Sequence, residues 1–177
     1  FEGHKDCVRS ASFSPDANKI VTASLDGTAK IWKTDTAEVL LTLSSHNAAV
    51  NSAVFSPDGK LIATSSLDRS AKIWDAESGK LLFSLQDHQG SVNYVAFSSD
   101  NKKLVTASSD NTAKIWDIAS GKLLVTLSGH ENSVNSASFS PDNLLVVTAS
   151  SDNTTKIWDS ISGKELRILK DHTSVVN

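Results

Sequence analysis

The residues best suited to chemistry in this sequence are a histidine, a threonine and an aspartate that recur in each of four units. The first set is His4, Thr22 and Asp26. An imidazole, a hydroxyl and a carboxylate are the parts of a hydrolase triad. Such a triad needs an exposed nucleophile, an oxyanion hole and one copy per site, whereas here the threonine lies in an apolar run and the set occurs four times. The pattern favours a structural role, and we predict that the protein is not an enzyme.

The same residues define an internal repeat. Four tryptophans and five histidines recur every 42 residues, without insertion or deletion: Trp32, Trp74, Trp116 and Trp158, and His4, His46, His88, His130 and His172. A period of this length is typical of propeller blades. The chain therefore holds four full units and a short remnant.

Each unit has the pattern of four short strands. In the second unit, four apolar runs, AVNSAVF, KLIATSS, SAKIWD and KLLFSL, alternate with the turn segments SPDG, LDR and AESG. Pro, Gly, Asp and Ser favour tight turns, and the density of β-branched residues favours strands over helices. The unit is predicted to be an antiparallel meander. The runs LIATSS and LVTASS carry apolar or small residues on both faces, which predicts that neighbouring sheets cover both faces.

The motifs SFSPD, DNTAKIWD and GH, at fixed offsets along the whole chain, resemble those of the WD-repeat β-propeller family. The resemblance implies an all-β fold, a β-propeller of WD-repeat type with four four-stranded antiparallel blades per chain. Residues 1–177 would form one propeller segment. The blades are expected at approximately 5–45, 46–87, 88–129 and 130–171, and residues 172–177 would start a further strand.

The resemblance also implies a hydrogen-bonded tetrad of His, Thr, Asp and Trp in each blade, which would fix the geometry of the blade. All four sets are complete: His4, Thr22, Asp26 and Trp32; His46, Thr64, Asp68 and Trp74; His88, Thr106, Asp110 and Trp116; His130, Thr148, Asp152 and Trp158. Departures are confined to neighbouring positions. The glycine before the histidine is kept at Gly3 and Gly129 but is replaced by Ser45, Asp87 and Asp171, and the aspartate after the tryptophan is Lys33 in the first unit.

Other kinds of site find little support. A metal needs converging ligands, but the histidines occur once per unit, and no Gly-rich phosphate loop follows a strand, so we predict no metal and no cofactor. A net charge of -3 with interspersed signs argues against nucleic acid. No apolar run approaches the roughly 20 residues of a membrane helix, and the first residues do not have the pattern of a secretory leader, so we expect neither membrane insertion nor secretion. The single cysteine, Cys7, is expected to be a buried or half-buried thiol in a reducing, cytoplasmic compartment.

Positions that differ between equivalent units are the candidates for recognition, because a shared scaffold leaves its loops free to vary. By the resemblance, they would rim the channel or the top face that binds partner peptides or protein domains: Arg9, Asn51, Arg69, Asn93, Tyr94 and Asn135. Arg and Tyr are favoured as binding anchors, which singles out Arg9, Arg69 and Tyr94. That these are only solvated loop residues remains an open alternative.

The number of blades predicts an assembly. The chain contains no methionine and is interpreted as a segment of a longer propeller chain, with Phe1 aligned to the end of an outermost strand. By the resemblance, such propellers usually close with seven or eight blades, so four would leave an open arc with two bare apolar faces.

We therefore expect a two-fold homodimer in which blade one of each chain meets blade four of the other, closing an eight-bladed ring. Each interface should exceed about 1,000 Å². The favoured function is a non-catalytic protein-interaction scaffold. The alternative is a purely structural or engineered module with no natural ligand.

Overall fold

The computed structural model describes residues 3–170 and 174–176, and within them the regular structure is entirely β-strand. The first sheet contains β1 (Val8–Phe13), β2 (Lys19–Ser24), β3 (Ala29–Lys33) and β4 (Val39–Leu43). The second contains β5 (Val50–Phe55), β6 (Leu61–Ser66), β7 (Ala71–Asp75) and β8 (Leu81–Leu85). The third contains β9 (Val92–Phe97), β10 (Lys103–Ser108), β11 (Thr112–Asp117) and β12 (Leu123–Ser128). The fourth contains β13 (Val134–Phe139), β14 (Leu145–Ser150), β15 (Thr155–Asp159) and β16 (Glu165–Leu169).

Each sheet is a four-stranded antiparallel meander in which neighbours in sequence are neighbours in the sheet. The predicted meander is confirmed. In the second sheet each strand begins one residue after the predicted apolar run and ends with it. The register repeats from sheet to sheet. For example, Thr22 pairs with Lys30 in the first sheet and Thr106 pairs with Lys114 in the third.

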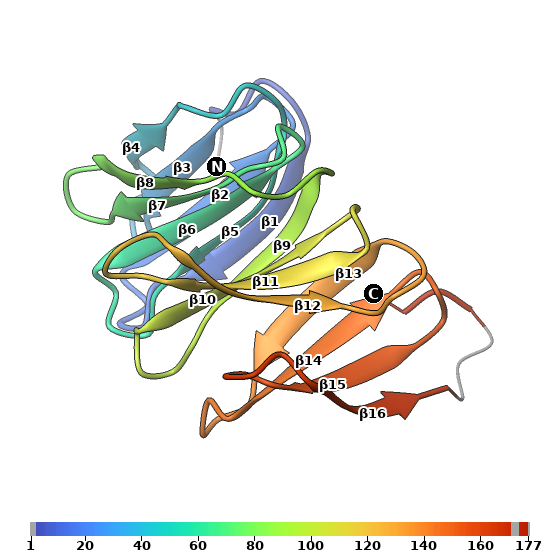
Figure 1. Cartoon of the computed structure of the whole chain (residues 1–177). Coiled ribbons are helices and arrows are strands. Elements are labelled where there is room, and N and C mark those ends of the chain that lie inside the picture. Colours follow the sequence, from blue (N-terminus) through green and yellow to red (C-terminus); the bar gives the residue numbers. More distant parts are fainter. Residues whose placement is uncertain (1–2, 171–173, 177) are drawn as a thin grey trace.

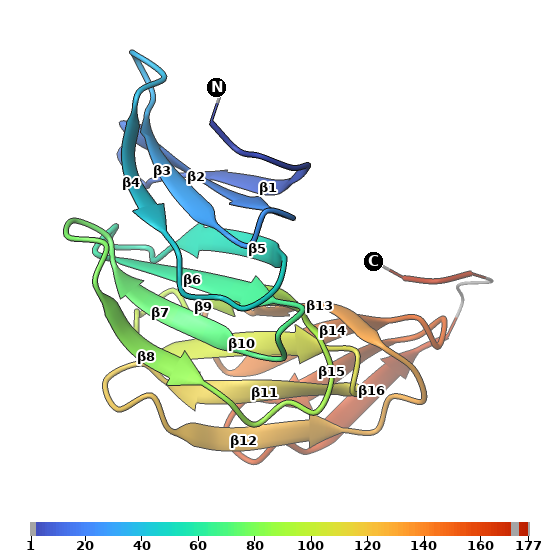
Figure 2. The ribbon, with the colours of Figure 1, turned by 90° about the horizontal axis from the view of Figure 1, so that it is seen from above.

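The four sheets follow one another around an arc (Figures 1 and 2). The first strand of each sheet lies on the inner side of the arc, and β4, β8 and β12 lie on the outer side (Figure 2). Adjacent sheets pack mainly through their first two strands. For example, β1 and β2 of the first sheet pack against β5 of the second, and β5 and β6 pack against β9 of the third. Among the described residues, no strand of the first sheet makes extensive contacts with a strand of the fourth sheet.

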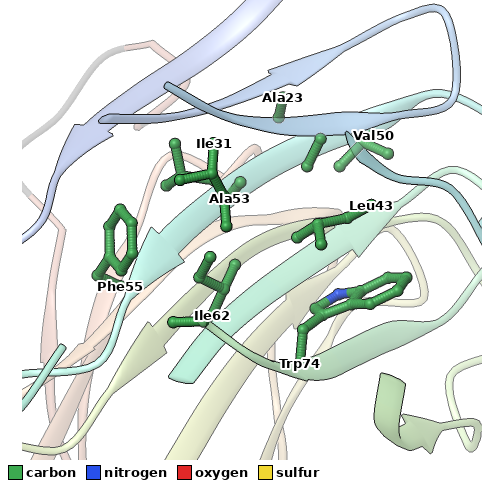
Figure 3. Close-up of a cluster of buried hydrophobic side chains, with 11 residues drawn as sticks. Ala23, Ile31, Leu43, Val50, Ala53, Phe55, Ile62 and Trp74 are labelled. Atoms are coloured by element: carbon green, nitrogen blue, oxygen red, sulfur yellow. The ribbon is translucent and has the colours of Figure 1, made fainter. Parts of the chain in front are cut away.

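The hydrophobic core lies between the sheets rather than within one of them. In the cluster shown in Figure 3, Ile31 and Leu43 of the first sheet pack against Val50, Phe55 and Trp74 of the second. Two further clusters repeat this arrangement between the second and third sheets and between the third and fourth. Each sheet therefore uses two different faces, one toward the preceding blade and one toward the following blade.

Burial along the arc depends on having a neighbour on each side. In β6 and β10 every residue after the first is buried, which confirms the prediction that both faces of these runs are covered. At the start of the arc most residues of β1 are exposed, whereas most residues of the equivalent β5 are buried. At the other end Leu169 is exposed, whereas the equivalent Leu85 and Leu127 are buried. The apolar surface that inner blades bury is therefore left open at both ends.

The prediction for Cys7 is wrong, because the thiol is exposed. At the equivalent positions Ala49, Ser91 and Ser133 are half-buried. Ser133 Oγ accepts from Asn93 of the preceding blade over 3.1 Å, whereas among the described residues no blade lies against Cys7. The exposure of Cys7 thus follows from its place at the end of the arc.

The predicted start of a further strand falls partly outside the described residues, as do Phe1 and His172. Residues 174–176 are described and do not form a strand. No helix in the described part of the chain has the length and hydropathy to cross a lipid bilayer.

Candidate functional site

Each blade contains the predicted four side chains in one hydrogen-bonded chain. In the first blade the Trp32 indole N–H donates to Thr22 Oγ1 over 2.7 Å, and Thr22 Oγ1 lies 2.7 Å from His4 Nε2. His4 Nδ1 lies 2.8 Å from Asp26 Oδ2. In the other three blades the same contacts span 2.7 to 2.9 Å. The tryptophan of the third strand is thereby linked to the turn between the second and third strands.

If the imidazole is neutral and carries its proton on Nδ1, every hydrogen bond of the tetrad has one donor and one acceptor. The indole donates to the threonine hydroxyl, the hydroxyl to histidine Nε2, and Nδ1–H to the aspartate. Burial lowers the pKa of His46 and of His130 below the ordinary 6.5, which favours the neutral form. Burial alone would raise the pKa of Asp68. Hydrogen bonds from the Ser70 hydroxyl, the Asn47 N–H and His46 outweigh it and lower the pKa to about 2. The second and fourth blades therefore pair an ionised carboxylate with a neutral imidazole.

A fifth side chain, which the sequence analysis missed, completes each network. Two residues after the aspartate, a hydroxyl donates to Asp Oδ1 over 2.6 Å in every blade: Thr28, Ser70, Thr112 and Thr154. The backbone N–H of the residue after the histidine donates to the other carboxylate oxygen, as Lys5 does to Asp26. The signal was present, since a Ser or Thr stands at this position in all four units. The aspartate therefore organises both its own turn and the loop of the histidine.

The network is closed to substrates. The four threonines are at most 6% exposed and the four imidazole side chains at most 5%. A nucleophile must reach its substrate, and these hydroxyls already accept from the tryptophan and contact the histidine. In the described part of the chain, no group of three or more His, Cys, Asp or Glu side chains is arranged to hold a metal.

Three of the predicted surface residues, all asparagines, donate to main-chain carbonyl groups in the following repeat, and two of them thereby connect neighbouring blades. Asn51 Nδ2 donates to the Val92 carbonyl over 2.9 Å, and Asn93 Nδ2 donates to the Val134 carbonyl over 2.9 Å. Asn135 Nδ2 donates to the Val176 carbonyl over 2.8 Å. Each bond runs to the residue 41 positions ahead. The first two join successive inner strands, and the third joins β13 to Val176, which lies in no strand.

Arg9 holds the same register in the first blade, where it replaces asparagine and is exposed. Arg9, Asn51 and Asn93 line a hollow of about 260 Å³ together with the exposed Leu67. The structure thus brings three of the six predicted contact residues together, from three successive blades. The amides of Asn51 and Asn93 already donate within the protein, but the exposed guanidinium and the exposed leucine can bind a carboxylate next to an apolar group.

The remaining candidates lie elsewhere. Arg69 is exposed in the turn between β6 and β7, at φ 69°, where the other blades carry Gly27, Asn111 and Asn153. Tyr94, on β9, lines a separate cavity of about 160 Å³ with residues of β13 and β14. The six residues therefore do not form one surface.

Four meanders with the same buried network, and no reachable catalytic group in it, define a repeat protein built of propeller blades. The sequence profile described as "WD domain, G-beta repeat" matches residues 1–33, 37–75, 79–117 and 121–159. The chain therefore belongs to the WD40 repeat family, whose members are generally non-catalytic and typically act as protein-interaction scaffolds. A search among curated proteins found no significant match.

Proposed function

We propose that this protein is a non-catalytic interaction scaffold that pairs with a second copy of itself to close a ring of eight blades. The observation that carries the proposal is the contrast between the ends of the arc and its interior. At the start, Val8 is 53% and Phe13 is 61% exposed, whereas Val50 and Phe55 in the second blade are 0% and 8% exposed. At the other end, Leu169 is 48% exposed, whereas its equivalent Leu127 is fully buried.

The two open faces are complementary because each inner junction joins the same two faces. The face that blade four leaves open carries Val147, Ile157 and Leu169, equivalent to residues that pack forward in the first three blades. Blade one leaves open the opposite face. In blades two to four the equivalent face packs against the preceding blade. A junction of unlike faces forms a closed ring when its rotation divides the circle. Two four-bladed chains would then meet at two equivalent junctions.

Charge supports a second copy as the occupant. At the inner junctions a Cβ on Gly79, Gly121 or Gly163 would meet Leu41, Phe83 or Val125 of the preceding blade, at 3.4, 2.6 and 2.5 Å. The equivalent positions at the proposed junction are Ala37 on blade one and Arg167 on blade four. Next to Ala37 stands Glu38, where the other blades carry Lys80, Lys122 and Lys164. Blade one therefore differs from the inner blades by the acidic Glu38 and blade four by the basic Arg167, and these two side chains would face each other in the ring.

A charge exchange tests the proposal. Glu38→Arg alone and Arg167→Glu alone each place like charges at both junctions of a homodimer, so each variant should dimerise at least about tenfold more weakly than the unmodified chain. In an equimolar mixture of the two variants, each junction again joins an arginine to a glutamate. The mixture should recover the unmodified dissociation constant, measured by sedimentation equilibrium over a dilution series.

Lys122→Glu is the matched control, since it makes the same change of charge as Arg167→Glu at an exposed position of an inner blade. It should leave the dissociation constant unchanged. A chain that stays at 18.9 kDa at all concentrations would contradict the proposed assembly. Dimers whose dissociation constant is the same in both charge variants as in the unmodified chain would contradict the proposed orientation.

The hollow lined by Arg9, Asn51, Leu67 and Asn93 supports the recognition part of the proposal. Its exposed guanidinium and leucine fit a peptide with a carboxylate beside an apolar side chain. Peptides selected against the chain from a random library should carry this pair and should lose affinity on Arg9→Ala. Selected peptides that bind the Arg9→Ala variant equally well would favour a purely structural module.

A further inference from the structure

The third strand of each blade carries a lysine two residues before the tetrad tryptophan. In blades two to four this lysine is only 6 to 7% exposed: Lys72, Lys114 and Lys156. Alternate residues of a strand share a face, so each lysine lies on the face of its tryptophan, toward the preceding blade. A buried ammonium group is costly unless an anion is paired with it. Each of these lysines therefore needs an acidic partner.

Blades three and four supply that partner from different positions. In blade three Lys114 Nζ lies 2.5 Å from Asp87 Oδ2, and in blade four Lys156 Nζ lies 2.7 Å from Glu165 Oε2. The side chains of Asp87 and Glu165 are 50% and 33% exposed, whereas those of both lysines are 9% exposed. The position of the anion beside the buried ammonium group is therefore accessible from solvent.

Blade two lacks the acid. The equivalents of Asp87 and Glu165 in this blade are Ser45 and Leu81. Among the described residues Lys72 forms no ion pair, and its Nζ reaches only the Ser84 hydroxyl, over 3.4 Å. Lys72 is thus as buried as the lysines of blades three and four but has no anion beside it.

The residue before the tetrad histidine contacts the lysine in both of the other blades. In blade three it is Asp87, paired as described above. In blade four it is Gly129, whose carbonyl accepts from Lys156 Nζ over 2.7 Å, and a Cβ on Gly129 would lie 3.5 Å from that nitrogen. Ser45 holds this position in blade two and is exposed. The repeat therefore places the Ser45 side chain beside the Lys72 ammonium group, where a hydroxyl supplies no charge.

We propose that Lys72 forms an anion site in blade two and that a phosphate group on Ser45 fills it, as the Asp87 carboxylate fills the site in blade three. A phosphoserine carries a charge of about −1.5 to −2 at neutral pH and three acceptor oxygens. The Lys72 ammonium group and the Ser84 hydroxyl are the donors to these oxygens. The inference does not depend on the proposed ring.

The modification is an ordinary phosphoryl transfer by a protein kinase. The γ-phosphoryl group of a nucleoside triphosphate forms a bond to Ser45 Oγ, its bond to the β-phosphate breaks, and the hydroxyl proton is released. A phosphate placed opposite a cation forms new charge-assisted hydrogen bonds. Phosphorylation of Ser45 therefore stabilises blade two.

Chains with phosphoserine incorporated at position 45 or, as a matched control, at position 44 test the proposal. Ser44 is the neighbouring exposed serine. Phosphoserine at position 45 should raise the thermal midpoint by about 2 to 4 °C relative to the control. Its second phosphate pKa, measured by ³¹P NMR, should lie below that of the control, because the ammonium group favours the dianion. Lys72→Met keeps an unbranched stem without the charge and should abolish both effects.

Two substitutions measure the same ion pair without a phosphate. Ser45→Asp recreates in blade two the pair of blade three and should raise the thermal midpoint, whereas Ser44→Asp should not. Asp87→Ser leaves Lys114 without its anion and should lower the midpoint. If neither Ser45→Asp nor Asp87→Ser changes the midpoint, the lysines need no anion and the proposal is wrong.

Inorganic phosphate distinguishes the two sources of a phosphate anion. Added to the unmodified chain at millimolar concentrations, it should leave the thermal midpoint unchanged. A rise that Lys72→Met abolishes would show that free phosphate fills the site, and the role of Ser45 would be overturned. Equal midpoints and equal phosphate pKa values for phosphoserine at positions 44 and 45 would overturn the anion site itself.

Discussion

The inner blades and the end blades of this chain have the same internal structure but different surroundings. The hydrogen bonds of the tetrad have nearly the same lengths in all four blades, and Trp32 and Trp158 at the ends are as buried as Trp74 and Trp116 inside. Yet Phe13 and Leu169 are open to solvent while their inner equivalents are covered. The tetrad is thus a property of one blade, whereas burial of its faces is a property of the neighbours.

The largest expected effect comes from the tetrad, inside an inner blade. Trp116→Ala removes a buried indole and leaves Thr106 without its donor, so unfolding by urea should be easier by about 3 to 5 kcal/mol. Trp158→Ala, in an end blade, should cost a similar amount, because its tetrad is equally buried. A loss below about 1 kcal/mol at Trp158 alone would show that the end blade is not built like the inner one.

Equivalent leucines on the blade faces should separate the two regions. Leu85→Ala removes a leucine that is 1% exposed between the second and third blades and should cost about 2 to 4 kcal/mol in urea unfolding. Leu169→Ala, measured at concentrations where the chain is monomeric, should cost less than about 1 kcal/mol. At higher concentrations the same substitution should weaken dimerisation. Equal costs in the monomer would mean that blade four is covered within one chain.

The pH dependence of stability should be shared by inner and end blades. The pKa values of His46 and His130 lie below 6.5 in the folded chain, so protons bind preferentially to the unfolded chain. Stability should therefore decrease as the pH falls from about 6.5 through the folded pKa values. A second decrease follows as the pH falls from 3.8 toward 2, since the pKa of Asp68 is lowered to about 2.

The midpoint of urea unfolding between pH 7 and pH 2 measures both effects. Asp68→Asn is the informative variant, because it removes one titrating carboxylate and should flatten the lower decrease while destabilising the chain at pH 7. Stability that rises as the pH falls below 6.5 would show that the imidazoles are charged in the folded chain.

The sequence was sufficient for the strands and the tetrads because both depend on contacts within one 42-residue unit. Turn residues and β-branched runs located the strands to within one residue in the second unit. The hydroxyl after each aspartate was equally periodic, and a search for every residue type repeated in all units would have found it.

The asparagine series illustrates what periodicity does not reveal. Asn51, Asn93 and Asn135 are polar residues that differ from Arg9, which made them candidates for a recognition surface. Their amides instead bond to carbonyl groups 41 residues ahead. An acceptor on the main chain of another blade has no signature in the residue types. Arg9 and Leu67 lie together in one hollow for the same reason, since the arc brings separate turns and strands side by side.

The amino-acid sequence specifies the blade, because each tetrad and each turn is satisfied by residues close together in the chain. It also specifies that a blade has two apolar faces, because runs such as LIATSS carry small or apolar residues at successive positions and hence on both faces of the strand. Which of these faces is covered depends on how the sheets stack, as Cys7 shows by its exposure. The position of Val176 beside blade four likewise follows from packing, since its carbonyl accepts from the Asn135 amide and its N–H donates to the Ser150 carbonyl.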